Sequence, residues 1–84
     1  PEIRVECPDD KKFALVEKVT EFFRREHNVI DIDGVRVLFD DGWGLVRASN
    51  TQPALVLRFE AMSESRLLEI RDLVESTLAN FKNA

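Results

Sequence analysis

The chain has very little cysteine, tyrosine and tryptophan, and each shortage argues against a class of protein. Its single cysteine, Cys7, cannot form an internal disulfide, and a lone thiol is typical of a reducing compartment. With no tyrosine and one tryptophan, the chain has few aromatic platforms on which single-stranded bases could stack. Its 12 lysines and arginines are outnumbered by 16 acidic residues, giving a net charge of −4. Nucleic acid is therefore not an expected partner, because its recognition relies on widespread positive surface.

Long apolar runs are missing as well. No stretch approaches the roughly 20 residues that cross a bilayer, and no signal peptide is visible, so we expect a cytoplasmic location and no membrane partner. The chain begins at Pro1 and not at a methionine, so we expect a processed or excised piece. What remains is 84 residues, 44% hydrophobic and 33% charged, the profile of a globular protein. So short a chain cannot divide its apolar residues between two cores, which predicts one domain over residues 1–84.

The first third of the chain predicts a strand and a helix. Residues 1–7 alternate as a half-buried strand, with every second side chain apolar: Ile3, Val5 and Cys7. Asp9 and Asp10 offer a cap for a helix from Lys11 to about Arg25. The buried stripe predicted for this helix consists of Phe13, Val16, Val19 and Phe23.

The remaining residues predict four strands and a second helix. The expected strands are 29–32, 35–39, 43–49 and 54–61, with tight turns at Asp33-Gly34 and Asp40-Asp41-Gly42. Ser63 caps the last helix, whose predicted buried positions are Leu67, Ile70, Val74, Leu78 and Phe81. The order β-α-β-β-β-β-α predicts an α+β two-layer sandwich, a mainly antiparallel sheet of four to five strands with two helices packed on one face.

Groups that suit an anion gather just after the 43–49 strand. Arg47 and Ser49 are two residues apart, so their side chains leave the same face of the strand, and Asn50 and Thr51 follow at once. An arginine fork matches two phosphate oxygens, and hydroxyls donate to the others. Asn50 tolerates a left-handed backbone, which would help a tight turn aim its amides at an anion, and Pro53 restricts the loop. The same residues are equally typical of an ordinary polar hairpin loop, and spacing alone does not decide.

Residues 42–61 resemble a known signature. Their sequence, GWGLVRASNTQPALVLRFEA, is similar to the C-terminal domain of α-D-phosphohexomutases, in the bacterial bifunctional phosphomannomutase/phosphoglucomutase branch. The likeness extends upstream through residues 33–37 to residues 1–3 and covers nearly the whole chain. Many relatives have glycine where this chain has Asn50, and the asparagine fits this branch better than the phosphoglucosamine mutases. Glutamate is common at the position of Gln52, so a role for that charge does not carry over.

The resemblance implies a function for the loop. Enzymes of this family interconvert 1-phospho and 6-phospho sugars through a bisphosphorylated intermediate, using a phosphoserine in the first domain and Mg²⁺ on an aspartate-rich loop of the second. A loop of the third domain reads the sugar hydroxyls. The fourth domain closes the cleft and binds the substrate phosphate that is not reacting, through the residues that here are Arg47, Ser49, Asn50 and Thr51.

The same resemblance sets the other expectations. The isolated domain should be inactive, with no catalytic residue and no metal ligand of its own, and Mg²⁺ is expected only in the full-length enzyme. Its partners should be glucose and mannose 1- and 6-phosphates and the other domains of the same enzyme. The family fold is like that of the TATA-box-binding protein.

Four further residues receive structural interpretations. His27 is a poor metal ligand without a second histidine or a cysteine nearby, and Cys7 is expected to be a buried structural thiol. Trp43 is expected in the core, and Arg58 in a surface ion pair.

Two other functions stay open at this level. One is a free-standing regulatory module that binds a small metabolite, and the other is a protein-interaction domain that uses the exposed face of its sheet. Convergence of Arg47, Ser49 and Thr51 distinguishes the mutase domain, because neither alternative requires it.

Overall fold

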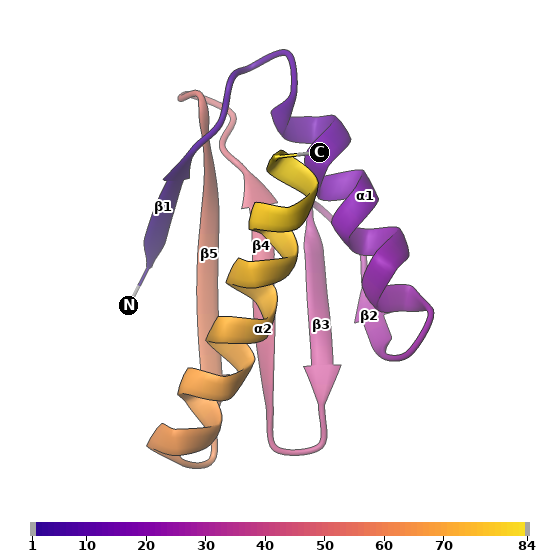
Figure 1. Ribbon diagram of the computed structural model, residues 1–84, viewed down its shortest axis with the longest axis vertical. Helices are drawn as coiled ribbons and strands as arrows, with labels where there is room; N and C mark the ends of the chain where they lie inside the picture. The colour runs from indigo at the N-terminus through magenta and orange to yellow at the C-terminus, as the bar shows by residue number, and fades with distance from the viewer. Residues whose placement is uncertain (1, 84) are drawn as a thin grey trace.

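The computed structural model describes residues 2–83 and confirms the predicted order of elements (Figure 1). The strands are β1 Ile3–Glu6, β2 Asn28–Ile30, β3 Val35–Phe39, β4 Gly42–Ala48 and β5 Ala54–Ala61, and the helices are α1 Lys12–Arg24 and α2 Glu64–Lys82. The second strand is shorter than predicted, because residues 31–34 form the turn that joins it to β3.

The five strands form one antiparallel sheet in the order β1-β5-β4-β3-β2. Strands β2 to β5 follow one another as a meander, since short turns make neighbours antiparallel. The β1 strand pairs with β5, so the first strand of the chain lies beside the last. Both helices lie on one face of this sheet, as Figure 1 shows, and the predicted two-layer α+β sandwich is confirmed.

The core lies between the sheet and the two helices. Strand alternation directs one set of apolar side chains at the helices, and the fully buried ones are Val35, Val37, Val46, Leu55 and Leu57 from the sheet and Val19, Phe23, Ile70 and Val74 from the helices. Cys7 is also buried among them, which confirms its structural interpretation. This core gives the chain the apolar interior that an independent domain needs.

The α1 helix starts and faces the sheet differently from the prediction. Neither Asp9 nor Asp10 caps it, since Lys11 is the capping residue and makes no side-chain cap bond. Phe13 is 61% exposed, so its place in the predicted buried stripe is wrong. The buried positions are Lys12, Leu15, Val19, Thr20 and Phe23, because the helix is rotated by about one residue from the predicted stripe.

The α2 helix begins as predicted. The Ser63 hydroxyl oxygen accepts a hydrogen bond from the Arg66 amide at 3.2 Å, which is the expected N-cap. The Arg66 side chain donates to Asp41 in the turn between β3 and β4 at 2.8 Å, and this hydrogen bond raises the pKa of the Arg66 guanidinium. The start of α2 is therefore tied to the sheet.

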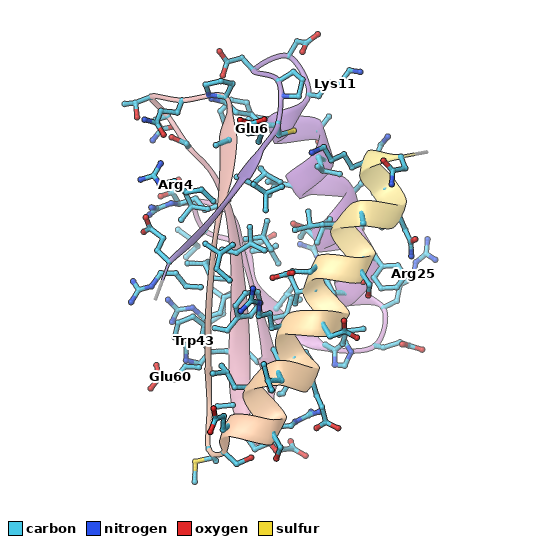
Figure 2. All side chains as sticks on the ribbon, turned by 60° about the vertical axis from the view of Figure 1, so that its left-hand side comes forward. Arg4, Glu6, Lys11, Arg25, Trp43 and Glu60 are labelled. Carbon is cyan, nitrogen blue, oxygen red and sulfur yellow. The ribbon has the colours of Figure 1, made fainter. Side chains whose placement is uncertain are left out.

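The second face of the sheet carries no helix. Figure 2 shows Arg4, Trp43 and Glu60 on this open face, on the side away from both helices. The expectation that Trp43 lies in the core is therefore wrong: its ring is partly exposed, and the Arg36 guanidinium lies 4.5 Å from the ring centroid. Residue 43 has the opposite parity to the core residue Val46, which places its side chain on the other face.

The two helices were compared with the length and apolarity that a membrane span requires. Within residues 2–83, neither helix is both long enough and apolar enough to cross a bilayer.

The turn before β3 contains two residues with positive φ angles, and substitutions there test whether this backbone conformation requires glycine. Gly34 has φ +112°, and a Cβ at this position would lie 2.6 Å from the Val46 carbonyl oxygen. We expect Gly34→Ala to lower the free energy of unfolding by about 1–3 kcal/mol, measured by urea denaturation. Asp33 also has a positive φ, of 56°. Asp33→Gly relieves strain there and should change stability by less than about 0.5 kcal/mol. Equal losses of unfolding free energy in the two variants would contradict the conclusion that only position 34 requires glycine.

Candidate functional site

The loop from Ser49 to Pro53 joins β4 to β5 and borders a hollow of about 340 Å³ on the open side of the sheet. Its polar lining brings together residues from two segments that are far apart in the chain: Glu2, Arg4, Arg47, Ser49, Asn50, Thr51 and Gln52. All four residues predicted for the site, Arg47, Ser49, Asn50 and Thr51, thus lie around one hollow. The structure places them together, as the spacing suggests.

Arg47 is the residue in the hollow that is best suited to an anion. It is half-buried and lies opposite Val56, which lies in turn opposite Arg4, so the three side chains share one row on the open face. The Arg47 side chain has no hydrogen bond or ion pair with any other residue in the range 2–83. Its five N–H donors therefore remain for a bound group.

Ser49 shapes the loop from within. Its hydroxyl oxygen accepts hydrogen bonds from the Thr51 amide at 3.3 Å and the Gln52 amide at 3.2 Å, and the residue is 9% exposed. The hydroxyl proton is still free to donate. Ser49 therefore organises the turn and retains one donor for a ligand.

Asn50 does not adopt the expected left-handed backbone. Apart from glycine, Asp33 is the one residue between positions 2 and 83 with a positive φ. The turn is made by the Ser49 hydroxyl, which removes the need for a left-handed residue at the tip. Asn50 and Thr51 are exposed at that tip, where both side chains border the hollow.

Two neighbours of the loop were not predicted as part of the site. Arg4 on β1 donates to the Gln52 side-chain oxygen at 2.6 Å and also pairs with Glu2 at 3.4 Å. Gln52 thus bonds a second guanidinium beside the hollow, a role that the family comparison of this position did not indicate.

The second neighbour of the loop that was not predicted as part of the site is Lys12 on α1. It is 5% exposed, and its ammonium donates to the Ser49 carbonyl at 2.5 Å and the Gln52 carbonyl at 3.1 Å. A signal for it is present in the sequence, since position 12 continues the buried stripe of Leu15, Val19 and Phe23 and holds a lysine where an apolar residue is expected.

Residues set aside in the sequence lie away from this hollow. His27 is half-buried beside Phe39, with ring centroids 4.9 Å apart. Arg58 is exposed and forms no ion pair within residues 2–83, so the expected ion pair is wrong. It lies opposite Leu45 of β4, whose side chain is apolar.

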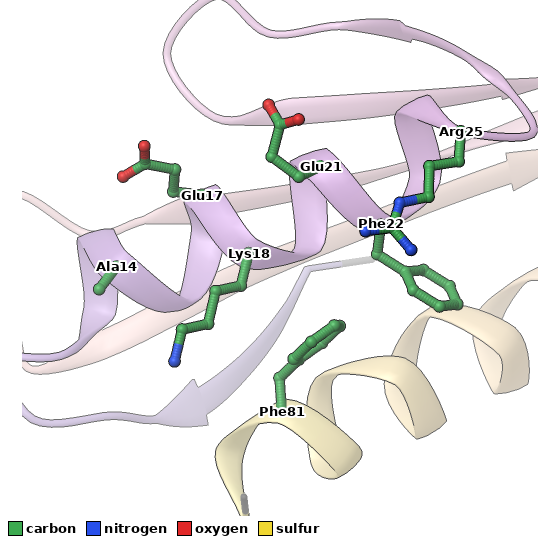
Figure 3. A pocket seen from close by; sticks show the side chains of 7 residues that line it. All are labelled: Ala14, Glu17, Lys18, Glu21, Phe22, Arg25 and Phe81. Carbon is green, nitrogen blue, oxygen red and sulfur yellow. The ribbon is translucent and has the colours of Figure 1, made fainter.

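A larger hollow, of about 550 Å³, lies on the helical layer. Figure 3 shows Phe22 of α1 and Phe81 of α2 facing each other there, with ring centroids 5.8 Å apart, flanked by charged side chains of α1. These charges alternate in sign, and no backbone loop borders them. The arrangement suits packing between two helices better than recognition of one anion.

The two hydroxyls of the loop can be separated by experiment. We expect Ser49→Ala to lower the free energy of unfolding by about 0.5–1.5 kcal/mol and to speed hydrogen exchange at the Thr51 and Gln52 amides, because both lose their acceptor. Thr51→Ala removes an exposed hydroxyl with no hydrogen bond to other residues of the described chain. This control should leave both properties unchanged, and faster exchange in both variants would refute the assigned role of Ser49.

Comparisons with known proteins assign the chain to a family. The family described as "Phosphoglucomutase/phosphomannomutase, C-terminal domain" matches residues 2–76. A phosphomannomutase/phosphoglucomutase of Pseudomonas putida is 47% identical over 79 residues, which are 93% of this chain and 17% of the relative. A probable phosphoglucosamine mutase of Methanopyrus kandleri is 48% identical over 69 residues, 81% of this chain and 15% of the relative.

A solved structure agrees with these sequence matches. A phosphoglucomutase/phosphomannomutase family protein from Burkholderia thailandensis superimposes with a TM-score of 0.76 at 36% identity, over 98% of this chain and 17% of that one. The chain thus spans about a sixth of the length of the proteins it matches. It belongs to the phosphoglucomutase/phosphomannomutase family, as the C-terminal domain.

Proposed function

We propose that this chain binds the non-reacting phosphate of a phosphosugar and closes the active-site cleft of a phosphomannomutase/phosphoglucomutase. The observation that carries the proposal is the single hollow bordered by Arg47, Ser49, Asn50 and Thr51, with the Arg47 guanidinium unpaired within residues 2–83. A half-buried, unpaired guanidinium in a protein of net charge −4 is most simply explained by a bound anion.

The chemistry of the reaction explains why the proposed site would recognise the phosphate and not the sugar. Interconversion of 1-phosphate and 6-phosphate requires the hexose to bind in two opposite orientations. A site that recognises only phosphate oxygens serves both, because the group it binds is the same each time. The hollow offers donors of that kind.

Closure of this domain over the cleft supplies the second part of the function. Binding of one phosphate by a mobile domain excludes water from the phosphoenzyme, which would otherwise be hydrolysed. Donors on a short, hydrogen-bonded loop suit this role, because they lose little entropy when the ligand binds.

The remaining components of the reaction belong to other domains. The Mg²⁺ of the full-length enzyme needs an aspartate-rich loop, and residues 2–83 contain no group of three His, Cys, Asp or Glu side chains placed to bind a metal. The proposal therefore assigns no metal ligand and no reacting group to this chain. The proposed partners are glucose and mannose phosphates and the other domains of the same enzyme.

A titration of the 84-residue chain tests the proposal. In ¹H–¹⁵N NMR spectra, glucose 1-phosphate and mannose 6-phosphate should both shift the amides of residues 47–53, and plain glucose should shift none. If these amide signals do not shift at millimolar concentrations of sugar phosphate, the proposed binding site is contradicted. Shifts confined to another surface would favour the alternative, a free-standing regulatory module that binds a small metabolite.

Substitution of the arginine gives the energetic test. We expect Arg47→Ala to weaken phosphate binding by about 1.5–3 kcal/mol, which is roughly 10- to 150-fold in Kd, without changing the thermal unfolding midpoint. Arg58→Ala is the matched control, because Arg58 is an unpaired arginine on the same open face away from the hollow. Equal weakening by both variants would show that general positive charge, and not this site, attracts the ligand.

A further inference from the structure

Lys12 has a bonding pattern that the proposed function leaves unexplained. Its ammonium donates hydrogen bonds to the Ser49 carbonyl at 2.5 Å and the Gln52 carbonyl at 3.1 Å, and it forms an ion pair with the Asp9 carboxylate at 2.9 Å. Its side chain is 6% exposed, whereas that of Asp9 is 72% exposed. A charge buried to this degree is costly unless fully bonded, so the lysine is held in one geometry.

We infer that Lys12 is a positioning residue for the phosphate loop, an inference that rests on the proposed function of that loop. Lys12 does not border the hollow and donates no bond to its interior. It acts through the backbone. By bonding the carbonyls at both ends of the Ser49–Gln52 turn, it fixes the orientation of the peptide units between them.

Peptide geometry links the lysine to the hollow. In a trans peptide the carbonyl oxygen of one residue and the N–H of the next point in opposite directions. The Ser49 carbonyl points at Lys12, which belongs to the helical layer, so the Asn50 N–H points away from that layer. The hollow, which Asn50 borders, lies on the opposite, open side.

The hydrogen bonds of the loop agree with this assignment. The Ser49 amide donates to Ala54, and the Thr51 and Gln52 amides donate to the Ser49 hydroxyl. The Pro53 carbonyl accepts from the Cys7 amide at 2.8 Å. Of the amides at positions 49–54, only that of Asn50 has no acceptor among residues 2–83, and it is the amide that Lys12 orients. One backbone donor is thereby reserved for a ligand.

Charge acts in the same direction as orientation. The Lys12 ammonium lies directly behind the loop, where solvent and salt screen it little. Its field favours an anion in front of the loop, and the exposed Asp9 offsets only part of it because water screens that carboxylate. The prediction is a loop that is ordered before the ligand arrives and that binds a phosphate dianion through Arg47 and the Asn50 amide.

Lys12→Met tests the inference, with Lys11→Met as the matched control. Both variants remove one lysine at the start of α1, but Lys11 is exposed and its side chain forms no hydrogen bond with the loop within residues 2–83. Methionine fills the space of the lysine stem, and the Asp9 carboxylate that loses its partner is exposed to solvent. The probe is inorganic phosphate, titrated into the 84-residue chain and followed through the amides of residues 47–53. Hydrogen exchange at residues 50–52 is measured without phosphate.

The expected result is specific to Lys12. Lys12→Met should raise the Kd for phosphate about tenfold and speed exchange of the Thr51 and Gln52 amides, while Lys11→Met matches the wild type in both. Equal Kd values and equal exchange in Lys12→Met and the wild type would overturn the inference while the proposed function stands. If phosphate shifts no amide of residues 47–53 in the wild type, the proposed function fails, and the exchange rates alone decide whether Lys12 orders the loop.

A measurement on the unaltered chain covers the case in which Lys12→Met does not fold. In ¹⁵N spectra of the lysine side chains at low temperature, the Lys12 ammonium should give a slowly exchanging signal that moves when phosphate binds. The exposed ammonium of Lys11 should exchange too fast to give one. A Lys12 signal that exchanges as fast as that of Lys11 would show that the ammonium is not held against the loop.

Discussion

The pairing of β4 with β5 is the constraint on which both the core and the site depend. Seven pairs, from Gly42 with Ala61 to Ala48 with Leu55, fix which side chains meet the helices and which lie on the open face. A slip by one residue would exchange the two sets, sending Arg47 into the core and Val46 to solvent. The same register closes the loop at Ser49, whose amide bonds the Ala54 carbonyl. It also leaves Gly44 beneath α2, where a Cβ would lie 3.1 Å from Val74.

Local geometry, and not net charge, is what allows this acidic chain to offer the anion site that we propose. Repulsion from 16 carboxylates falls off within a Debye length, about 8 Å at physiological salt, whereas the donors around the hollow act at contact distance. Arg47 supplies a fork, Ser49 organises the turn, and Lys12 places a buried positive charge behind it. Each depends on the antiparallel pair that brings the two ends of the loop together.

Sequence patterns predicted the order of elements, the two-layer fold and the grouping of the four candidate residues at the end of β4, because each follows from neighbours along the chain. Alternation in β5 sets Leu55, Leu57 and Phe59 on the core side, and a run of polar residues after a strand marks the loop. The expectations for Trp43, Phe13 and Asp9 were wrong for one shared reason. Each assigned a side chain by its type, apolar to the core or acidic to a cap, where strand parity, helix rotation or an ion pair with Lys12 decided instead.

The sequence by itself therefore determined the faces of the strands, the position of the loop and the chemical groups that the loop carries. Only the tertiary structure decided what lies behind and beside that loop. Lys12 meets the Ser49 carbonyl across 37 residues of chain, and Arg4 meets Gln52 across 48. Periodicity reports which way a side chain leaves its own element, and no more. Which distant backbone it meets is set by the packing of α1 and β1 against the sheet, since that contact exists only once the core has formed.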